Sequence, residues 1–289
     1  MLKDSVIIGY LANIFPDISS RKIDFHRIGG MSNINYLVDI EEKKYVLRIP
    51  GTASEGMVVR ADEKRNSLIA SQLNINPPIA YFDEKVGIKM VEYVSDAQTL
   101  DAELIQQPEN LNLIASLYRK LHNSGIRLRN DFNLFSEIEK YNGLIKQYGA
   151  KMYEPDNIYH RLPHLERRLN EIGVKLCACH NDGVPENFLR SGNRMYLIDW
   201  EYSGMNDPIA DLAALFLESE FSQDNQNYIL NSYFEHIIPS DTQERILIYQ
   251  ILWDYLWAQW TVIKESKGDD FGAYGRMRFE RALKNIQLL

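Results

Sequence analysis

Apolar side chains recur first at helical and then at strand spacing along the first fifty residues. From Ser5 to Phe15 the spacing is helical, and Pro16 followed by polar residues interrupts it. From Phe25 to Ile49 the pattern is that of strands, with INYLVDI and YVLRI separated by the charged tetrapeptide Glu41 to Lys44. The sequence therefore predicts a short leading helix followed by a hairpin.

The next segment adds one helix and two strands to this pattern. Arg60 to Leu73 has helical spacing, whereas Ile79 to Phe82 and Gly87 to Val94 have the pattern of strands. We therefore predict that residues 1–94 form a small lobe with an antiparallel sheet and one main helix.

Beyond about Asp96 the pattern becomes mainly helical. Helical spacing predicts helices at Pro108 to His122, Asn133 to Tyr148 and Asp156 to Ile172, and Gly173 is a suitable end for the last of these. A second, larger lobe is therefore expected to begin here.

Two strand signals interrupt the helical region before it resumes at Pro208. Val174 to Cys179 is strand-like and leads into HNDGVPEN, and a turn at Ser191 to Asn193 leads into the apolar run MYLIDW. Residues 95–289 are thus predicted to form a mainly helical lobe, which makes the fold class α+β. Because no Gly/Ser linker separates the two lobes, we expect them to share an interface that carries the function.

The composition is that of a folded protein and narrows the choice of partners. The 289 residues are 45% hydrophobic and 25% charged, unlike a disordered chain. A net charge of −8 opposes nonspecific binding to nucleic acid or anionic lipid and suits a cationic substrate. We find neither a secretory leader pattern nor an apolar stretch long enough to span a bilayer. We therefore expect a cytoplasmic protein that binds neither nucleic acid nor membrane, and the sequence leaves its oligomeric state open.

The two cysteines lie one residue apart, just before a histidine. Cys177 and Cys179 flank Ala178 and precede His180. Cysteines this close cannot link distant segments, which suits a reducing cytosol. Zinc sites usually separate their cysteines by two or more residues, so the spacing favours buried strand positions over a metal site that includes His180.

The strongest chemical signal is His180-Asn181-Asp182 followed by Asn187, and then by Asp199 after a predicted hairpin. Phosphoryl transfer needs a carboxylate near the acceptor hydroxyl and oxygen ligands that hold Mg²⁺ on the phosphates. We predict that Asp182 takes the hydroxyl proton, that Asn187 and Asp199 coordinate Mg²⁺, and that His180 is a scaffold residue. Any one of these residues alone would be explained as a polar turn or cap, but their combined spacing favours catalysis.

Two longer segments resemble a known superfamily. HND…PENFL and IDWEYSGMNDPIADLAALFLE are similar to segments of choline and ethanolamine kinases, particularly bacterial choline kinases. These enzymes belong to the aminoglycoside phosphotransferase superfamily, which shares the protein-kinase fold and its H-x-D-x-x-x-x-N loop. The resemblance covers nearly the whole chain and implies a two-lobed protein-kinase-like fold, with ATP as phosphoryl donor and Mg²⁺ as metal. It also implies that Asp211 braces the catalytic loop.

The resemblance implies a nucleotide site in the first lobe. IGGMSNINYLV resembles the phosphate-covering loop of choline kinases, which makes Gly30 and Ser32 candidate ATP contacts. Arg48 stands in the place of the kinase strand lysine, where it would pair with the phosphates and with Glu63. Without the catalytic loop, Arg48 and Glu63 would be interpreted as solvated surface charges.

Residues Met90 to Val94 would form the hinge between the lobes. Their backbone groups would face adenine, because they join the last strand of the first lobe to the helical lobe. Glu92 and Val94 are the candidate contacts, and the identity of their side chains matters little.

Aromatic residues at helical spacing suggest which molecule accepts the phosphoryl group. Trp257 and Trp260 lie in a stripe that in an unknown fold is usually core. Choline carries a quaternary ammonium without N–H donors, so aromatic faces and carboxylates recognise it best. LWAQW is similar to the tryptophan pair that walls the choline site of eukaryotic choline kinases, and Tyr274 and Glu218 match further residues near that site. The resemblance therefore implies that these residues and Asp182 bind choline.

Choline kinase is the first hypothesis among several. Ethanolamine kinase would use the same loop with more hydrogen-bond acceptors, and aminoglycoside or thiamine kinases would need a differently shaped cleft. A catalytically silent nucleotide-binding scaffold is disfavoured because Asp182, Asn187 and Asp199 are all present. The chain departs from its relatives at Gly183, where they carry a bulky apolar residue, and we expect this glycine to loosen the loop.

Overall fold

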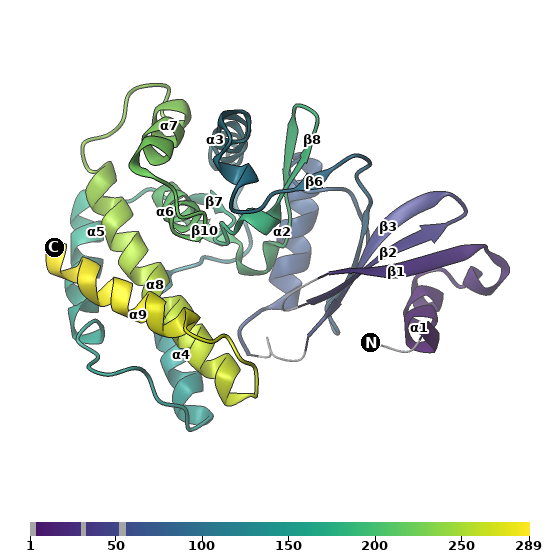
Figure 1. The fold of residues 1–289 in the computed structure, drawn as a ribbon, viewed down its shortest axis with the longest axis horizontal. Helices are drawn as coiled ribbons and strands as arrows, with labels where there is room; N and C mark the ends of the chain where they lie inside the picture. The colour runs from purple at the N-terminus through teal and green to yellow at the C-terminus, as the bar shows by residue number, and fades with distance from the viewer. Residues whose placement is uncertain (1–3, 30–32, 52–55) are drawn as a thin grey trace.

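The chain folds into a sheet-containing lobe and a larger helical lobe that lie side by side (Figure 1). The structure is a computed structural model, and it describes residues 4–29, 33–51 and 56–289. Strands dominate the chain up to about Glu92, and helices dominate the remainder. This is the α+β arrangement with a small antiparallel lobe that the sequence predicts.

The sheet of the first lobe is antiparallel, with its described strands in the order β1-β2-β3-β5-β4. In the predicted hairpin Ile40 pairs with Lys43, so the turn consists of Glu41 and Glu42, both with positive φ. The strands are β1 (Ile23–Gly29), β2 (Asn33–Ile40), β3 (Lys43–Pro50), β4 (Ile79–Asp83) and β5 (Ile88–Glu92).

A small core holds the leading helix α1 (Asp4–Ile14) to this sheet. Ile7 and Leu11 are fully buried and share one apolar cluster with Val38 and Leu47 of the central strands. Because side chains on a strand alternate between the two faces, the inward set of β2 and β3 provides this surface. The 3₁₀ turn η1 (Ile18–Ser20) follows α1 and leads into β1.

The main helix of the first lobe, α2 (Arg60–Gln72), is anchored to the helical lobe. Ala70 and Ile75 belong to the large apolar core of the second lobe and not to that of the sheet. The Asn66 side-chain amide donates hydrogen bonds to the hydroxyl (3.1 Å) and the carbonyl (3.3 Å) of Ser203. The two lobes therefore share a continuous interface, as expected.

The second lobe is built around the long helix α8, which packs against α4, α6 and α9 (Figure 1). No helix in the described parts of the chain is long and apolar enough to cross a membrane. The described helices of the second lobe are α3 (Pro108–His122), α4 (Leu134–Gln147), α5 (Leu162–Ile172), α6 (Pro208–Glu218), α7 (Gln223–Tyr233), α8 (Thr242–Ser266) and α9 (Tyr274–Asn285).

Short strands and 3₁₀ turns precede, connect or follow these helices. The strands are β6 (Gln98–Thr99), β7 (Cys177–Cys179), β8 (Phe188–Ser191), β9 (Arg194–Leu197) and β10 (Gly204–Asn206). The 3₁₀ turns are η3 (Leu104–Gln106), η4 (Tyr159–Arg161), η5 (Pro185–Asn187), η6 (Trp200–Tyr202) and η7 (Ile286–Leu288).

Four of these elements differ from the sequence prediction. The helix expected from Asp156 begins only at Leu162, where Pro163 occupies the first turn and loses no hydrogen bond. The strand expected from Val174 is confined to Cys177–Cys179. Strands β6 and β10 were not predicted, because two or three residues are too few to display an alternating pattern.

Candidate active site

The loop between β7 and η5 carries the H-x-D motif, and Asp211 at the start of α6 holds it. The Asp211 carboxylate accepts hydrogen bonds from the backbone N–H of His180 (2.8 Å) and of Asn181 (2.5 Å). Asn181 adopts a left-handed conformation with φ of 65°, which is uncommon for residues other than glycine. The buried carboxylate therefore fixes an unusual backbone turn immediately before Asp182.

His180 is a fully buried part of the same scaffold. Its two ring nitrogens lie 3.0 Å from the carbonyl of Asp182 and 2.8 Å from the carbonyl of Ile198. Burial lowers the pKa of this imidazole, although the charge of Asp211 opposes the effect. His180 thus ties the catalytic loop to the segment that carries Asp199, and its geometry suits support and not reaction.

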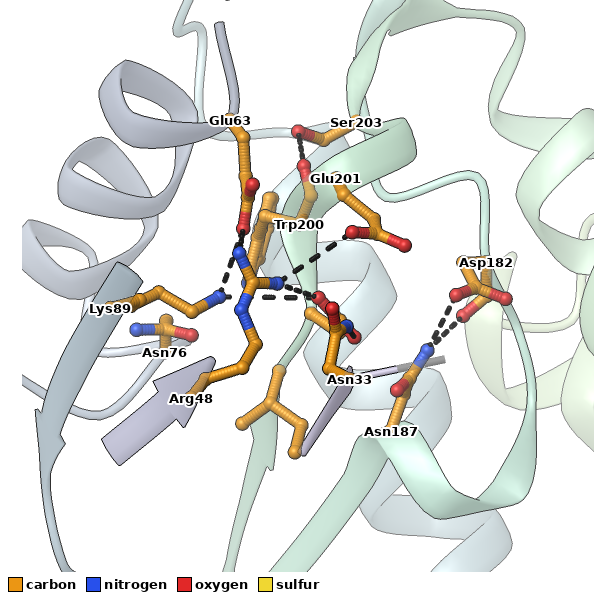
Figure 2. A network of polar contacts seen from close by, with 12 residues as sticks. Asn33, Arg48, Glu63, Asn76, Lys89, Asp182, Asn187, Trp200, Glu201 and Ser203 are labelled. Carbon is orange, nitrogen blue, oxygen red and sulfur yellow. Dashed lines mark hydrogen bonds and ion pairs between the residues drawn. The ribbon is translucent and has the colours of Figure 1, made fainter. Parts of the chain in front are cut away.

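Asp182 and Asn187 face each other across one turn of the loop (Figure 2). The Asn187 side-chain nitrogen donates to the Asp182 carboxylate (2.9 Å) and to its carbonyl (3.1 Å). Because this nitrogen points at Asp182, the amide oxygen of Asn187 is left to accept or to ligate. Burial, followed by the charges of Asp199 and Glu218, raises the pKa of Asp182 well above its usual value.

Asp199 meets the first lobe through Arg48. The Arg48 guanidinium lies 2.6 Å from the Asp199 carboxylate and also forms an ion pair with Glu63 of α2. Asp199 has a left-handed backbone with φ of 64°, so its strained conformation projects the carboxylate toward the sheet. The structure therefore contains the Arg48–Glu63 pair that was expected and adds Asp199 to it.

Three further charged residues belong to this cluster although sequence reasoning did not select them. Lys89 on β5 places its ammonium 3.2 Å from Glu63, and Arg60 lies 3.0 Å from Glu201. Both looked like solvent-facing charges, since Lys89 lies on a strand and Arg60 opens a helix. Lys89 lies directly opposite Arg48 on the neighbouring strand. The alternation of side chains along β5 was the signal in the sequence that could have placed Lys89 near Arg48.

The cluster shifts the pKa values of two of its carboxylates, Glu63 and Glu201, in opposite directions. Burial would raise the pKa of Glu63, but the charges of Arg48, Lys89 and Arg60 lower it to about 2. Burial and the charge of Asp199 raise the pKa of Glu201 to about 7, with Arg48 opposing. Glu201 therefore titrates near neutrality while Glu63 stays charged.

The described residues provide the donor set that a magnesium ion prefers. Carboxylate oxygens of Glu63, Asp199 and Glu201 all lie within 4.8 Å of one another. Mg²⁺ binds hard oxygen ligands, and the free amide oxygen of Asn187 is of the same kind. The chemistry of the site thus fits a divalent cation held at Asp199.

The predicted nucleotide contacts are only partly described. Gly30 and Ser32 lie outside the described residues. Asn33, which follows them, donates its side-chain N–H to Asp199 at 3.4 Å. At the predicted hinge, the Glu92 N–H donates a hydrogen bond to the Pro78 carbonyl, and the Val94 side chain is half-buried. Glu92 ends β5, and Val94 lies in the segment that leads from β5 to the helical lobe.

The aromatic stripe lies on α8, and most of it is core. Trp253 is fully buried and stacks on Trp257 with ring centroids 5.8 Å apart. Trp257 and Trp260 contact each other edge to face at 6.1 Å, and they keep only 7% and 9% of their surface exposed. The structure brings this pair together, but Trp253 belongs to the packed interior.

Glu218 and Tyr274 meet through Arg278, a residue that the sequence reasoning passed over. The buried guanidinium of Arg278 forms an ion pair with Glu218, and it donates to the Tyr274 hydroxyl (2.9 Å) and to Asp254 (3.0 Å). The Glu218 charge is therefore already paired. An arginine on an amphipathic helix gave no sign of burial in the sequence.

Protein cations also contact two of the predicted substrate rings. The Lys264 ammonium lies 5.1 Å from the Trp260 ring centroid, and the Arg278 guanidinium lies 4.9 Å from that of Tyr274. Such contacts are the cation–π type that a quaternary ammonium would make. These two rings therefore already have cations of the protein as neighbours.

Gly183 is packed tightly and does not have the open surroundings of a loose loop. A Cβ atom at this position would lie 2.6 Å from the backbone nitrogen of Leu215 and 2.7 Å from its Cα. The expectation that Gly183 loosens the loop does not take account of this contact. The glycine lets the catalytic loop approach the backbone of α6, where Asp211 also lies.

The fold and this site define a class of small-molecule phosphotransferases with a protein-kinase-like fold. The aminoglycoside phosphotransferase APH(2'')-Ib matches 99% of this chain with a TM-score of 0.61 at 15% identity, a likeness of fold alone. The model of the choline/ethanolamine kinase family matches residues 25–249. The chain belongs to the choline/ethanolamine kinase family.

Relatives within this family match nearly the full length. Protein LicA of Haemophilus influenzae is 32% identical over 284 residues, which is 96% of this chain and 84% of the relative. The crystal structure of choline kinase LicA from Streptococcus pneumoniae is 38% identical, covers 99% of both chains and has a TM-score of 0.83. A structure of LicA in complex with AMP is 37% identical over 98% of both chains, with a TM-score of 0.82.

Proposed function

We propose that this protein is a choline kinase that transfers the γ-phosphoryl group of ATP to the hydroxyl of choline, giving phosphocholine and ADP. The observation that carries the proposal is the convergence of Asp182, Asn187 and the Arg48-bound Asp199 between the two lobes, in a chain of this family. The similarity to a choline kinase from Streptococcus pneumoniae over its whole length supports choline as the acceptor.

We assign the reacting groups from their positions. Asp182 orients the choline hydroxyl and takes its proton as the oxygen bonds to the γ-phosphorus and ADP leaves. Its raised pKa suits this proton transfer, since an effective base has a pKa closer to the working pH. His180 and Asp211 support the loop that places this carboxylate.

Arg48 and Lys89 are the cations placed to bind the ATP phosphates, and Glu63 orients both of them. Asp199, Asn187 and Glu201 are the residues that would hold Mg²⁺. When bound, Mg²⁺ neutralises the charge that develops on the transferred group. The AMP complex of the similar LicA supports a nucleotide site in this cleft.

We infer the division of labour between lobes from the same arrangement. Residues 1–94 would bind the nucleotide through Gly30, Ser32, Arg48 and Glu63, with Glu92 and Val94 at the hinge. Residues 95–289 would supply the catalytic loop and the acceptor site. A cytoplasmic location, where ATP is available, fits this role.

We place the choline ammonium against Trp257, Trp260 and Tyr274. The contact of Trp257 with Trp260 and the link of Tyr274 to Glu218 through Arg278 support the assignment, because aromatic faces and a nearby carboxylate recognise a quaternary ammonium. Glu218 would act mainly through Arg278, by holding Tyr274 in place.

A coupled assay of ADP release tests the proposal directly. Purified protein with ATP and Mg²⁺ would be given choline, ethanolamine, thiamine or an aminoglycoside in parallel. We expect the highest kcat/KM with choline. A higher kcat/KM with ethanolamine or another acceptor would reassign the substrate, and ADP release with none of them would indicate a silent scaffold.

A further inference from the structure

A second cluster of chemically active side chains lies where α3 contacts both α7 and β7. It consists of His122 at the end of α3 and the two thiols of β7, Cys177 and Cys179. One potential ligand atom from each lies within 4.8 Å of the others. His180, the histidine that adjoins the thiols in sequence, bonds to two carbonyls instead.

The two thiols have the separation that a tetrahedral metal ion requires. Side chains two residues apart on a strand point to the same face, and the sulfur atoms of Cys177 and Cys179 lie 3.6 Å apart. Two thiolates bound to one zinc ion at about 2.3 Å in tetrahedral geometry lie about 3.8 Å apart. The short sequence spacing is therefore no obstacle once the strand geometry is known.

His122 already has the second partner that a metal-bound histidine usually has. Its Nε2 lies 3.0 Å from the Asp211 carboxylate, and its Nδ1 lies 2.8 Å from the Tyr233 hydroxyl. With the proton on Nε2 facing Asp211, the Nδ1 lone pair accepts a hydrogen bond from the Tyr233 hydroxyl, and a metal ion would take that hydrogen's place. Metal-ligating histidines commonly donate their other N–H to a carboxylate in this way.

We propose that His122, Cys177 and Cys179 form a binding site for a thiophilic divalent cation, with Zn²⁺ as the fitting ion. Each thiol gives its proton to solvent as the metal–sulfur bond forms, and the Tyr233 hydroxyl or a water completes four-coordination. Cys179 is buried, but Cys177 is partly exposed and provides the path of entry. The site shares no residue with the proposed magnesium ligands, which are hard oxygens.

Zinc binding to the whole protein tests the site, in buffer with a phosphine reductant and excess Mg²⁺. We expect one Zn²⁺ per chain, protection of both thiols from alkylation, and a thiolate charge-transfer band when Cd²⁺ replaces Zn²⁺. Cys177→Ser and Cys179→Ser should each weaken Zn²⁺ binding by at least about 10-fold, the scale on which even the partners of metal ligands act.

Cys177→Ser is the decisive variant, because a partly exposed side chain can be changed without disturbing the core. His164→Gln, at an exposed position on α5, is the matched control and should bind Zn²⁺ as the parent does. The proposal is overturned if Cys177→Ser binds Zn²⁺ as tightly as the parent. Thiols that alkylate equally fast with and without Zn²⁺ would overturn it as well.

Discussion

The Arg48 guanidinium lies 2.6 Å from the Asp199 carboxylate, although 151 residues separate them in the sequence. This contact joins the sheet of the first lobe to the segment that follows the catalytic loop. It places the cation proposed to bind the ATP phosphates beside the carboxylate proposed to hold Mg²⁺.

Asp182→Asn should reduce the rate of phosphorylation by ~10²- to 10⁴-fold, because the amide cannot take the hydroxyl proton. The melting temperature should change little, since the Asn187 contact at 2.9 Å can be kept by an amide oxygen. Steady-state rates and melting curves on the purified variant measure both effects. Asp224→Asn, at an exposed position on α7, is the control. Activity of Asp182→Asn within a few-fold of the parent would rule out the proposed role.

Asp199→Ala should abolish Mg²⁺-dependent turnover, and Asn187→Ala should weaken it, since both remove a hard oxygen ligand. Titrating activity against Mg²⁺ measures the loss, and EDTA should stop turnover by the parent. Asp199→Ala also leaves Arg48 without one of its partners, so a lower melting temperature is expected as well. A normal Mg²⁺ dependence in Asp199→Ala would contradict the metal assignment.

Trp257→Ala and Trp260→Ala should raise the KM for choline by up to about 30-fold while the KM for ATP hardly moves, because a cation–π contact contributes about 0.5–2 kcal/mol. Trp253→Ala is the matched control from the same helix face. Its ring is fully buried, so we expect Trp253→Ala to lower the free energy of unfolding by about 3–5 kcal/mol. It should affect the KM for choline and the KM for ATP equally. If the Trp257 and Trp260 variants affect both KM values equally, the stripe is core alone.

Glu201→Gln should change how stability depends on pH. The pKa of Glu201 is raised from 4.5 to about 7, so the folded chain keeps a proton that the unfolded chain loses. The stabilisation from this group is complete below about pH 4.5 and is lost as the pH rises to about 7, by about 3 kcal/mol at most. Denaturant unfolding of parent and variant between pH 4.5 and 8 measures the difference. Parallel curves would show that Glu201 does not titrate in this range.

Gly183→Ala should destabilise the protein by about 1–3 kcal/mol and lower its activity, because the added methyl group meets the backbone of α6, which cannot rotate away. Gly143→Ala on α4 is the control, since a Cβ there has no neighbour within 4 Å and alanine favours a helix. Melting curves and ADP-release rates report both outcomes. An unchanged Gly183→Ala would mean that the loop accommodates a side chain freely.

The sequence predicted the fold where periodicity was long, and it indicated a candidate site where spacing was specific. The helices from Pro108 and Asn133 and the hairpin of β2 and β3 emerged because their apolar patterns extend over many residues. The loop residues Asp182 and Asn187 emerged because phosphoryl transfer demands that order of groups.

The missed residues lacked a local signal. Lys89 and Arg278 are buried charges, and only tertiary structure supplies the partners that allow their burial, Glu63 for one and Glu218 with Asp254 for the other. The pattern of charged and apolar residues along the sequence predicts that such side chains face solvent. The same holds for His122, which becomes a neighbour of Cys177 only after α3 packs on β7.

The anchoring of α2 to the helical lobe has a mechanical consequence. Asn66 is tied to Ser203, and Ala70 packs in the larger core, so a tilt of the sheet would leave α2 behind with the helices. The shear plane then runs between β3 and α2, through the ion pair of Arg48 with Glu63. Any rocking of the sheet would stretch this pair together with the Arg48–Asp199 contact, and so couple the position of the cation proposed to bind the phosphates to the distance between the lobes.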